Sequence, residues 1–167
     1  MMDQLHKLDG RCHCGNIRYR YYSPVTTEDL TIRACRCSYC TKIGGRYTSD
    51  PQGILVAEVF DCEAIHLYRF ATGTANFYVC GRCGMAPFVT CLLDDIMYAL
   101  VNVNTLNDFC PIRAQIAYAD FSHEDRETRL SRRRTKWIGN VTLTLPHGET
   151  MLGEEPVYSH ETCHSLE

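Results

Sequence analysis

The sequence lacks an apolar run long enough to cross a membrane, since no window approaches the ~18 apolar residues of a transmembrane helix. Its first residues also lack the apolar stretch of a secretory signal. There is no basic excess either, because 17 Lys and Arg stand against 20 Asp and Glu for a net charge of −3. Such a balance argues against a general nucleic-acid or anionic-membrane binder. We therefore expect a cytoplasmic protein with no membrane partner and no nucleic-acid partner.

Two common catalytic signatures are missing as well. The sequence contains no Gly-rich phosphate loop ending in Lys and Ser/Thr, and nothing in it sets up a Ser/His/Asp triad. At 167 residues, 45% hydrophobic and 22% charged, the chain has the composition and size of one globular domain. A phosphate-loop enzyme and a serine hydrolase are both disfavoured.

Short segments rich in β-branched and aromatic residues recur along the chain, separated by Gly, Pro, Asp or Asn. This spacing is typical of an all-β protein, and we expect two or three small antiparallel sheets with little helix. The predicted strands cover residues 17–22, 31–34, 53–60, 64–70, 75–80, 88–92, 97–102 and 115–119.

A polar, arginine-rich segment follows the predicted strands. Residues 122–136 are expected to form a helix or an exposed strap outside the sheets. We therefore divide the chain into a zinc-binding β domain, residues 1–125, and an Arg-rich strap with a C-terminal extension, residues 126–167. The extension is expected to pack on the domain or to be partly flexible.

Eleven cysteines are the most informative feature of the sequence. Without an export signal the chain is expected in a reducing compartment, where disulfides are rare and metal thiolates are the better explanation. In C-x-C and C-x-x-C spacings two sulfurs can face one ion, and zinc is the metal such sites favour, with an iron–sulfur centre as the alternative. Seven cysteines fall in three such motifs: Cys12 and Cys14; Cys35, Cys37 and Cys40; and Cys80 and Cys83.

Seven ligands cannot close two tetrahedral sites. Structural zinc sites have four protein ligands, whereas catalytic sites have three and leave one position open. We assign the closed structural site to Cys12, Cys14, Cys80 and Cys83, and the open site to Cys35, Cys37 and Cys40. Spacing leaves two alternatives. Cys35 and Cys37 can instead pair with Cys80 and Cys83, or a fourth ligand from His13, His66 or a distant cysteine can close the second site.

Three stretches carry a resemblance to a known family. Residues 10–19, 34–40 and 67–84 resemble the glutathione-dependent formaldehyde-activating enzyme family, also called the centromere protein V family, in motif order and spacing. The resemblance covers roughly residues 8–119. It implies a zinc-bound β-tent fold with two zinc ions per chain, one structural and one catalytic, partitioned as above. Position 36 departs from the pattern, because Arg36 stands where the family commonly has His.

The resemblance also implies an activity. The family's founding reaction condenses formaldehyde with glutathione, so we expect a zinc-dependent carbon–sulfur lyase or synthase. Its substrates would be glutathione with a small aldehyde, or a related glutathione adduct, and its catalytic residues Cys35, Cys37 and Cys40. Arginines near the motifs, which either grip the glutathione carboxylates or offset thiolate charge, are Arg33, Arg36, Arg46 and Arg82.

The rival hypothesis is a non-catalytic zinc scaffold that binds nucleic acid or a protein through the basic strip Arg126–Lys136.

Overall fold

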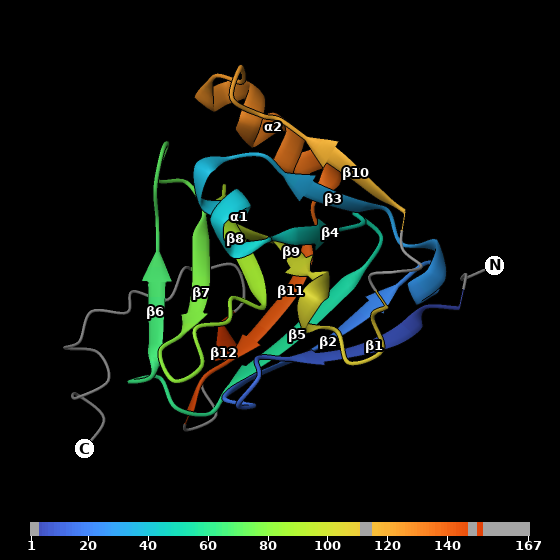
Figure 1. Ribbon diagram of the computed structural model, residues 1–167, viewed down its shortest axis with the longest axis vertical. Helices are drawn as coiled ribbons and strands as arrows, with labels where there is room; N and C mark the ends of the chain where they lie inside the picture. The colour runs from blue at the N-terminus through green and yellow to red at the C-terminus, as the bar shows by residue number, and fades with distance from the viewer. Residues whose placement is uncertain (1–3, 111–114, 147–149, 152–167) are drawn as a thin grey trace.

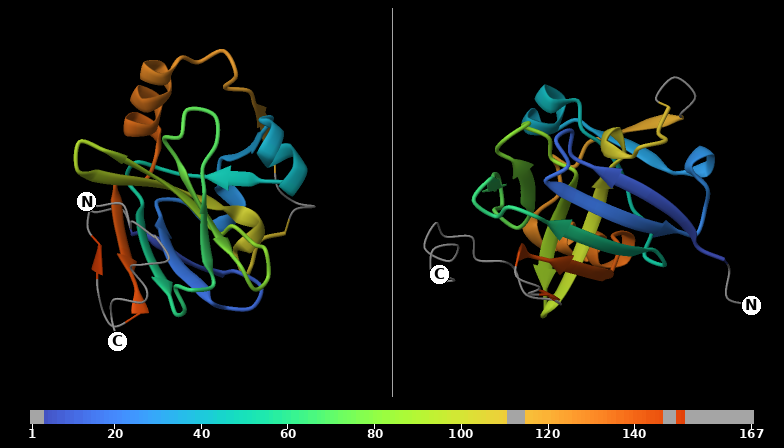
Figure 2. Two further views of the ribbon diagram at one scale, coloured as in Figure 1. Left: turned by 90° about the vertical axis from the view of Figure 1, so that its left-hand side faces the viewer. Right: turned by 90° about the horizontal axis from the view of Figure 1, so that it is seen from below.

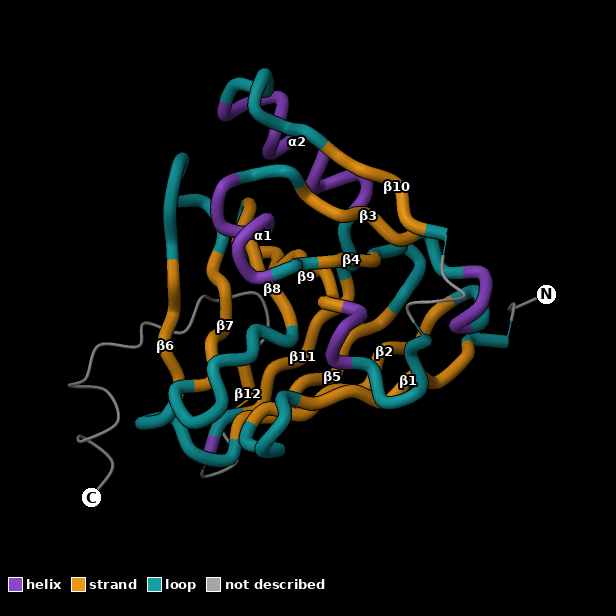
Figure 3. The backbone as a smooth tube through the Cα atoms, viewed as in Figure 1, coloured by secondary structure: helices purple, strands orange, loops and turns teal. Residues whose placement is uncertain are grey.

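Two β-sheets make up most of the molecule (Figures 1 and 3). The computed structural model describes residues 4–110, 115–146 and 150–151. Sheet one has five strands in the order β1 (His6–Arg11), β2 (Ile17–Ser23), β5 (Ile54–Val59), β11 (Asn140–Thr144) and β12 (Thr150–Met151). Sheet two has seven, in the order β10 (Ile116–Ala119), β3 (Ile32–Cys35), β4 (Arg46–Thr48), β9 (Ile96–Asn102), β8 (Phe88–Leu93), β7 (Asn76–Cys80) and β6 (Ile65–Tyr68).

The all-β prediction is confirmed. Most neighbouring strands are antiparallel, as expected, but β10 pairs with β3 and β11 pairs with β5 in parallel. The helices in the described part of the chain are α1 (Ser38–Ile43), α2 (Arg126–Lys136), and the short 3-10 turns Thr27–Asp29 and Val103–Thr105. None of these helices is long and apolar enough to cross a bilayer. Strand β1, strand β4 and helix α1 were not predicted.

The core lies between the sheets because the strands alternate inward and outward side chains. In β2, Ile17, Tyr19 and Tyr21 are buried while Arg18 and Arg20 are exposed. They pack against inward residues of sheet two, which include Phe88, Met97 and Val101.

Sheet two is covered on its other face too. Val89, Cys91 and Tyr98, which alternate with the core residues of β8 and β9, join Tyr47 and Trp137 in a second cluster. Helices α1 and α2 and the β6–β7 hairpin lie at this end of the molecule, with the hairpin between the helices (Figure 2). Both faces of the central strands are therefore apolar, which explains their continuous hydrophobic sequence.

Helix α2 is packed rather than freely exposed. Asp125 caps its start, with its side chain accepting a hydrogen bond from Thr128 N at 2.8 Å. Arg133 is buried and donates to the carbonyl oxygen and hydroxyl of Thr74 at 3.0 and 2.7 Å. The prediction of a helix over this segment therefore holds. The division at residue 125/126 stays a prediction, and the extension from residue 152 onward lies outside the described residues.

Candidate metal centres

The first group of cysteines joins the two sheets. Cys12 and Cys14 lie in the turn between β1 and β2, where Cys12 N donates to Ile17 O at 2.9 Å and Gly15 N donates to Cys12 O at 3.0 Å. Gly15 has a φ of 82°, a left-handed conformation that side chains rarely adopt. The tight turn therefore presents both sulfurs on one side.

Cys80 and Cys83 come from the end of β7 in the other sheet. Gly84 N donates to Cys80 O at 2.7 Å, and Cys80 N donates to Met85 O at 2.9 Å, which folds the chain into a knuckle. Gly84 takes a φ of 74°, and a Cβ on Gly81 would lie 2.8 Å from His66 Nε2. The left-handed backbone therefore favours glycine at position 84, whereas a side chain at position 81 would require the exposed His66 ring to move.

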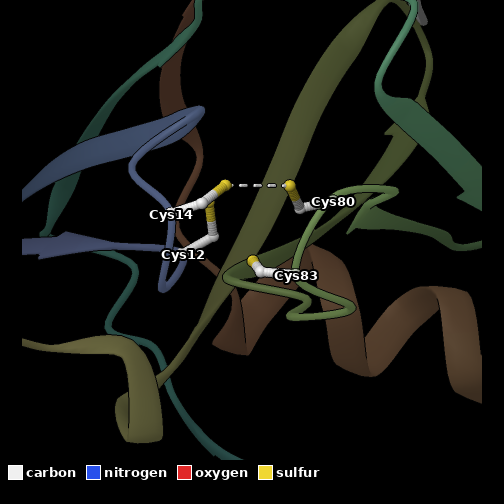
Figure 4. Close-up of side chains that lie close together, drawn as sticks. All are labelled: Cys12, Cys14, Cys80 and Cys83. Atoms are coloured by element: carbon white, nitrogen blue, oxygen red, sulfur yellow. Dashed lines mark hydrogen bonds between the residues drawn. The ribbon is translucent and has the colours of Figure 1, made fainter.

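The four sulfur atoms converge on one point (Figure 4). All four Sγ atoms lie within 4.8 Å of one another, with Cys12 to Cys14 at 3.7 Å and Cys14 to Cys80 at 3.5 Å. A tetrahedral zinc ion with Zn–S bonds of about 2.3 Å separates its sulfurs by about 3.8 Å. The separations are therefore compatible with a closed four-thiolate zinc site.

Burial and backbone donors act against each other in this group. Burial raises the pKa of Cys12 to about 12. At Cys83 burial also favours the thiol, yet hydrogen bonds from the backbone of Cys14 and Met85 outweigh it and lower the pKa to about 6. A metal ion binds cysteine as the thiolate, and burial disfavours that charged form. The positive charge of an ion in this group would therefore stabilise the thiolates.

The second group contains three cysteines. Cys35 ends β3, while Cys37 and Cys40 flank the first turn of α1, and their Sγ atoms lie within 4.8 Å of one another. Cys37 is the N-cap of this helix, and its Sγ accepts a hydrogen bond from Cys40 N at 3.4 Å. Within the residues that the structure describes, no fourth His, Cys, Asp or Glu completes the group.

A buried phenol lies against this triad. Tyr47, which is 4% exposed, has its hydroxyl 3.4 Å from Cys40 Sγ. A Cβ on Gly45 would lie 2.4 Å from this hydroxyl, so the glycine leaves room for it. Hydrogen bonding with Cys40 lowers the pKa of Cys35 to about 6, and the same contact with burial raises the pKa of Cys40. Burial raises the pKa of Tyr47, which keeps the phenol protonated and so able to donate to a Cys40 thiolate.

Aromatic rings form a wall beside α1. Tyr39 lies on the helix between two cysteines of the triad, with its ring 4.8 Å from Tyr68, 5.3 Å from Phe70 and 5.0 Å from Phe77. Tyr68 is 44% exposed. The contribution of β6 and β7 to this aromatic cluster was not predicted from the sequence. The sequence signal for it is the density of aromatic residues in the two hairpin strands.

The arginines near the motifs are already engaged in several places. Arg33 donates to Ser49 Oγ at 2.7 Å, and Arg46 Nη1 lies 3.4 Å from Asn104 Oδ1. Arg36 stacks over Tyr118 at 4.9 Å. Arg82 pairs with Asp61. None of these contacts is a metal-ligand contact, and a role in holding glutathione stays a prediction.

The structure gathers the seven cysteines into the two groups expected from spacing and resemblance: Cys12, Cys14, Cys80 and Cys83, and Cys35, Cys37 and Cys40. His13 and His66 join neither group within the described part of the chain. That the groups hold zinc, and that the triad is catalytic, stays a prediction.

Comparison with known proteins identifies relatives for most of the chain. The family model described as "Glutathione-dependent formaldehyde-activating enzyme" matches residues 7–121. A protein of Halomonas elongata named "Putative glutathione-dependent formaldehyde-activating enzyme" is 32% identical over 89 residues, which are 49% of this chain and 55% of that protein. The chain thus spans about half the length of this curated relative. The crystal structure of a Rhodobacter sphaeroides protein aligns with 66% of this chain and 99% of its own, with 23% identity and a TM-score of 0.47.

Proposed function

The chain belongs to the glutathione-dependent formaldehyde-activating enzyme family, and from this membership we propose that it is a zinc-dependent carbon–sulfur lyase or synthase. Its proposed substrates are glutathione with a small aldehyde, or a related glutathione adduct. The reducing compartment that keeps its clustered thiols available for metal would be the cytoplasm.

The contrast between the two cysteine groups supports this proposal most directly. One group offers four sulfurs in a spacing that suits a closed structural ion, while the other offers three. An ion held by Cys35, Cys37 and Cys40 would retain an open position, which is the difference between catalytic and structural zinc sites. We assign the structural ion to the group that joins the sheets.

Zinc bound by the triad would supply Lewis acidity and a position at which an incoming thiol ionises. The protein's own residues prepare that position. Cys37 is fixed as a helix cap, and the Tyr47 hydroxyl lies within hydrogen-bond distance of Cys40 Sγ. Donation from this phenol withdraws charge from the Cys40 thiolate, so the triad donates less electron density and favours a further anionic ligand.

The proposed reaction conserves all atoms. The glutathione sulfur forms a bond to the aldehyde carbon, the carbonyl π bond breaks, and the proton lost by the thiol ends on the new hydroxyl oxygen. Cleavage of a hydroxyalkyl thioether is the same reaction in reverse. Because the two reactants also combine in water unaided, holding them together is the larger contribution expected from the protein.

Cobalt substitution with glutathione tests the proposal. Cobalt bound by the triad should give a visible thiolate spectrum that shifts when glutathione is added. The S-methylated analogue, which has no ionisable thiol, should leave the spectrum unchanged and is the matched control. A spectrum that does not respond to free glutathione would mean that the fourth position is closed by protein. In that case catalysis at the triad would be abandoned in favour of a purely structural role.

A further inference from the structure

The outer face of sheet one carries a concentration of positive charge beside the turn that holds Cys12 and Cys14. Strand alternation points the side chains of Lys7, Asp9 and Arg11 of β1 outward, beside Arg18 and Arg20 of β2. Across β2, Glu58 of β5 completes the charged groups opposite them. This face therefore has a net charge of +2 on a chain whose net charge is −3.

Two of these arginines are placed directly against each other. Arg11 and Arg18 are cross-strand partners, a position in which like charges destabilise a sheet unless something lies between them. Arg11 Nη1 and Arg18 Nη2 each lie 3.5 Å from the position that a Cβ on Gly15 would occupy. These two nitrogen atoms are therefore no more than twice that distance apart. A single carboxylate or phosphate group fits between two guanidinium groups at this spacing.

The carboxylates beside these arginines are Asp9, the register partner of Arg20, and Glu58, the register partner of Arg18. Lys7 takes Asp9 in an ion pair at 3.1 Å. Among the described residues no carboxylate forms an ion pair with Arg11, Arg18 or Arg20, although Glu58 is the register partner of Arg18.

The arginines line a cavity. A hollow of about 410 Å³ is bordered by all three arginines, by the carboxylates Asp9 and Glu58, and by Asn107. Its lining therefore carries one net positive charge, and its volume suits a small organic molecule. Arg18 is held in place, since its Nε donates to Gly15 O at 3.1 Å and its guanidinium stacks over Phe60 at 4.8 Å. Arg20 lies two residues along the same face, which is roughly 7 Å away.

We propose that this hollow binds a small molecule with two anionic groups about 7 Å apart. Arg11 and Arg18 hold one group between them, and Arg20 holds the other by its guanidinium fork. Dicarboxylates and bisphosphates share this chemistry. The site is separate from the proposed reaction at the triad and does not depend on it.

A simpler role for part of this cluster is to offset the charge of the four thiolates, because Arg11 and Arg18 both approach the turn that carries Cys14. Arg20 distinguishes the two explanations. It lies outside that turn, so it has no role in offsetting thiolate charge, whereas a ligand with two anionic groups requires it.

Calorimetry on the full zinc-loaded chain at low ionic strength tests the proposal, with glutarate and a sugar bisphosphate as probes and acetate as the single-anion control. At least one dianion should bind about tenfold more tightly than acetate, and the tighter one identifies the source. Arg20→Gln should remove that tenfold preference and leave acetate unchanged, while Arg11→Gln should weaken all three. Arg126→Gln, an exposed arginine on α2, should change nothing.

Three results would overturn the proposal. The first is equal affinity for the dianions and acetate. The second is an equal loss of affinity in Arg126→Gln and Arg20→Gln, which would mean unspecific charge attraction. The third is a loss of zinc in Arg11→Gln with unchanged dianion binding in Arg20→Gln, which would show that the arginines serve only the metal turn.

Discussion

The hydroxyl of Tyr47 lies 3.4 Å from the Sγ of Cys40, and both side chains are buried, at 4% and 3% exposure. They come from different elements, since Tyr47 lies in β4 and Cys40 in α1. Gly45, between them in sequence, has no side chain to separate them. The phenol therefore lies next to the triad, and its removal should change the properties of a metal ion bound there.

Tyr47→Phe should leave the fold and the zinc content intact but change the triad. Without the donated hydrogen bond the Cys40 thiolate gives more charge to the metal, so a bound thiol ionises less readily. The pH profile of kcat/KM for glutathione should move to higher pH, and activity should fall about tenfold or more. The resting spectrum of the cobalt-substituted protein should shift as well, which is measurable without any turnover.

Tyr19→Phe is the matched control. It also removes a buried hydroxyl, one that hydrogen-bonds to Thr105 Oγ1 at 2.8 Å in the main core. It should lower stability without changing the cobalt spectrum. Equal spectra for Tyr47→Phe and the wild-type protein would remove Tyr47 from the proposed mechanism.

The cysteine groups should separate stability from activity. Structural zinc contributes an apparent ~10–16 kcal/mol in small zinc domains, as much as the whole net stability of a typical domain. Cys80→Ser should therefore unfold or aggregate the chain, because the site it serves joins the two sheets. Cys37→Ser should remain folded and lose glutathione-dependent turnover. Circular dichroism and activity on the same preparations check both outcomes, and a folded, active Cys80→Ser would refute the assignment.

Metal content gives an independent measure. The wild-type protein purified without chelator should carry close to two zinc ions per chain, and Cys37→Ser close to one. Elemental analysis beside a thiol count in denaturant provides the measurement. One zinc in the wild-type protein would contradict two separate sites, and iron would redirect the assignment to a redox centre.

The sequence predicted the cysteine groups better than it predicted the elements around them. Motifs with fixed spacing constrain geometry locally, so Cys12 and Cys14 could be placed together without knowing the sheets. Helix α1 was missed because only six residues form it, and its start is set by a cysteine cap instead of an apolar period. Strand β1 was missed because its exposed outer face made residues such as Lys7 and Asp9 look like a loop.

Long-range pairings were beyond the reach of spacing. Nothing local indicates that β11 pairs in parallel with β5, more than 80 positions earlier in the chain. The contact between Tyr47 and the triad depends in the same way on how β3, α1 and β4 follow each other in space. Such contacts are fixed by the packing of the whole sheet.

Acid should weaken the local contact between Glu124, which precedes α2, and Arg132 of that helix. Its carboxylate accepts two hydrogen bonds from Arg132, at 2.7 and 2.9 Å, and these lower its pKa below the ordinary value of 4.5. The folded state thus holds the ionised form, so this contribution is present above about pH 4.5 and is lost as pH falls through the lowered pKa. Glu124→Gln should lack it at every pH.

Thermal melts of both proteins between pH 3.5 and pH 7 measure this contribution. Acid also releases metal from thiolates, but that loss is common to both proteins, so the difference in melting temperature isolates Glu124. The difference should be greatest near neutral pH and shrink below about pH 4.5. A constant difference over the whole range would show that the Glu124–Arg132 pair does not contribute through ionisation.

Arg133→Ala should destabilise the protein, whereas Arg126→Ala should not. Arg133 is 7% exposed, donates two hydrogen bonds to Thr74 and stacks over Trp137 at 4.9 Å, so it ties α2 to the β6–β7 hairpin. Its removal leaves the partly buried Thr74 carbonyl without this donor and creates a cavity, but it also removes a buried cation whose Nε has no hydrogen-bond partner. The net cost in the free energy of unfolding should be about 2 kcal/mol, seen as a lower urea midpoint with an unchanged m value.

Arg126, exposed at the start of the helix, should change stability by less than about 0.5 kcal/mol. Equal effects of the two substitutions would mean that α2 is held by general charge and not by the Arg133 contact.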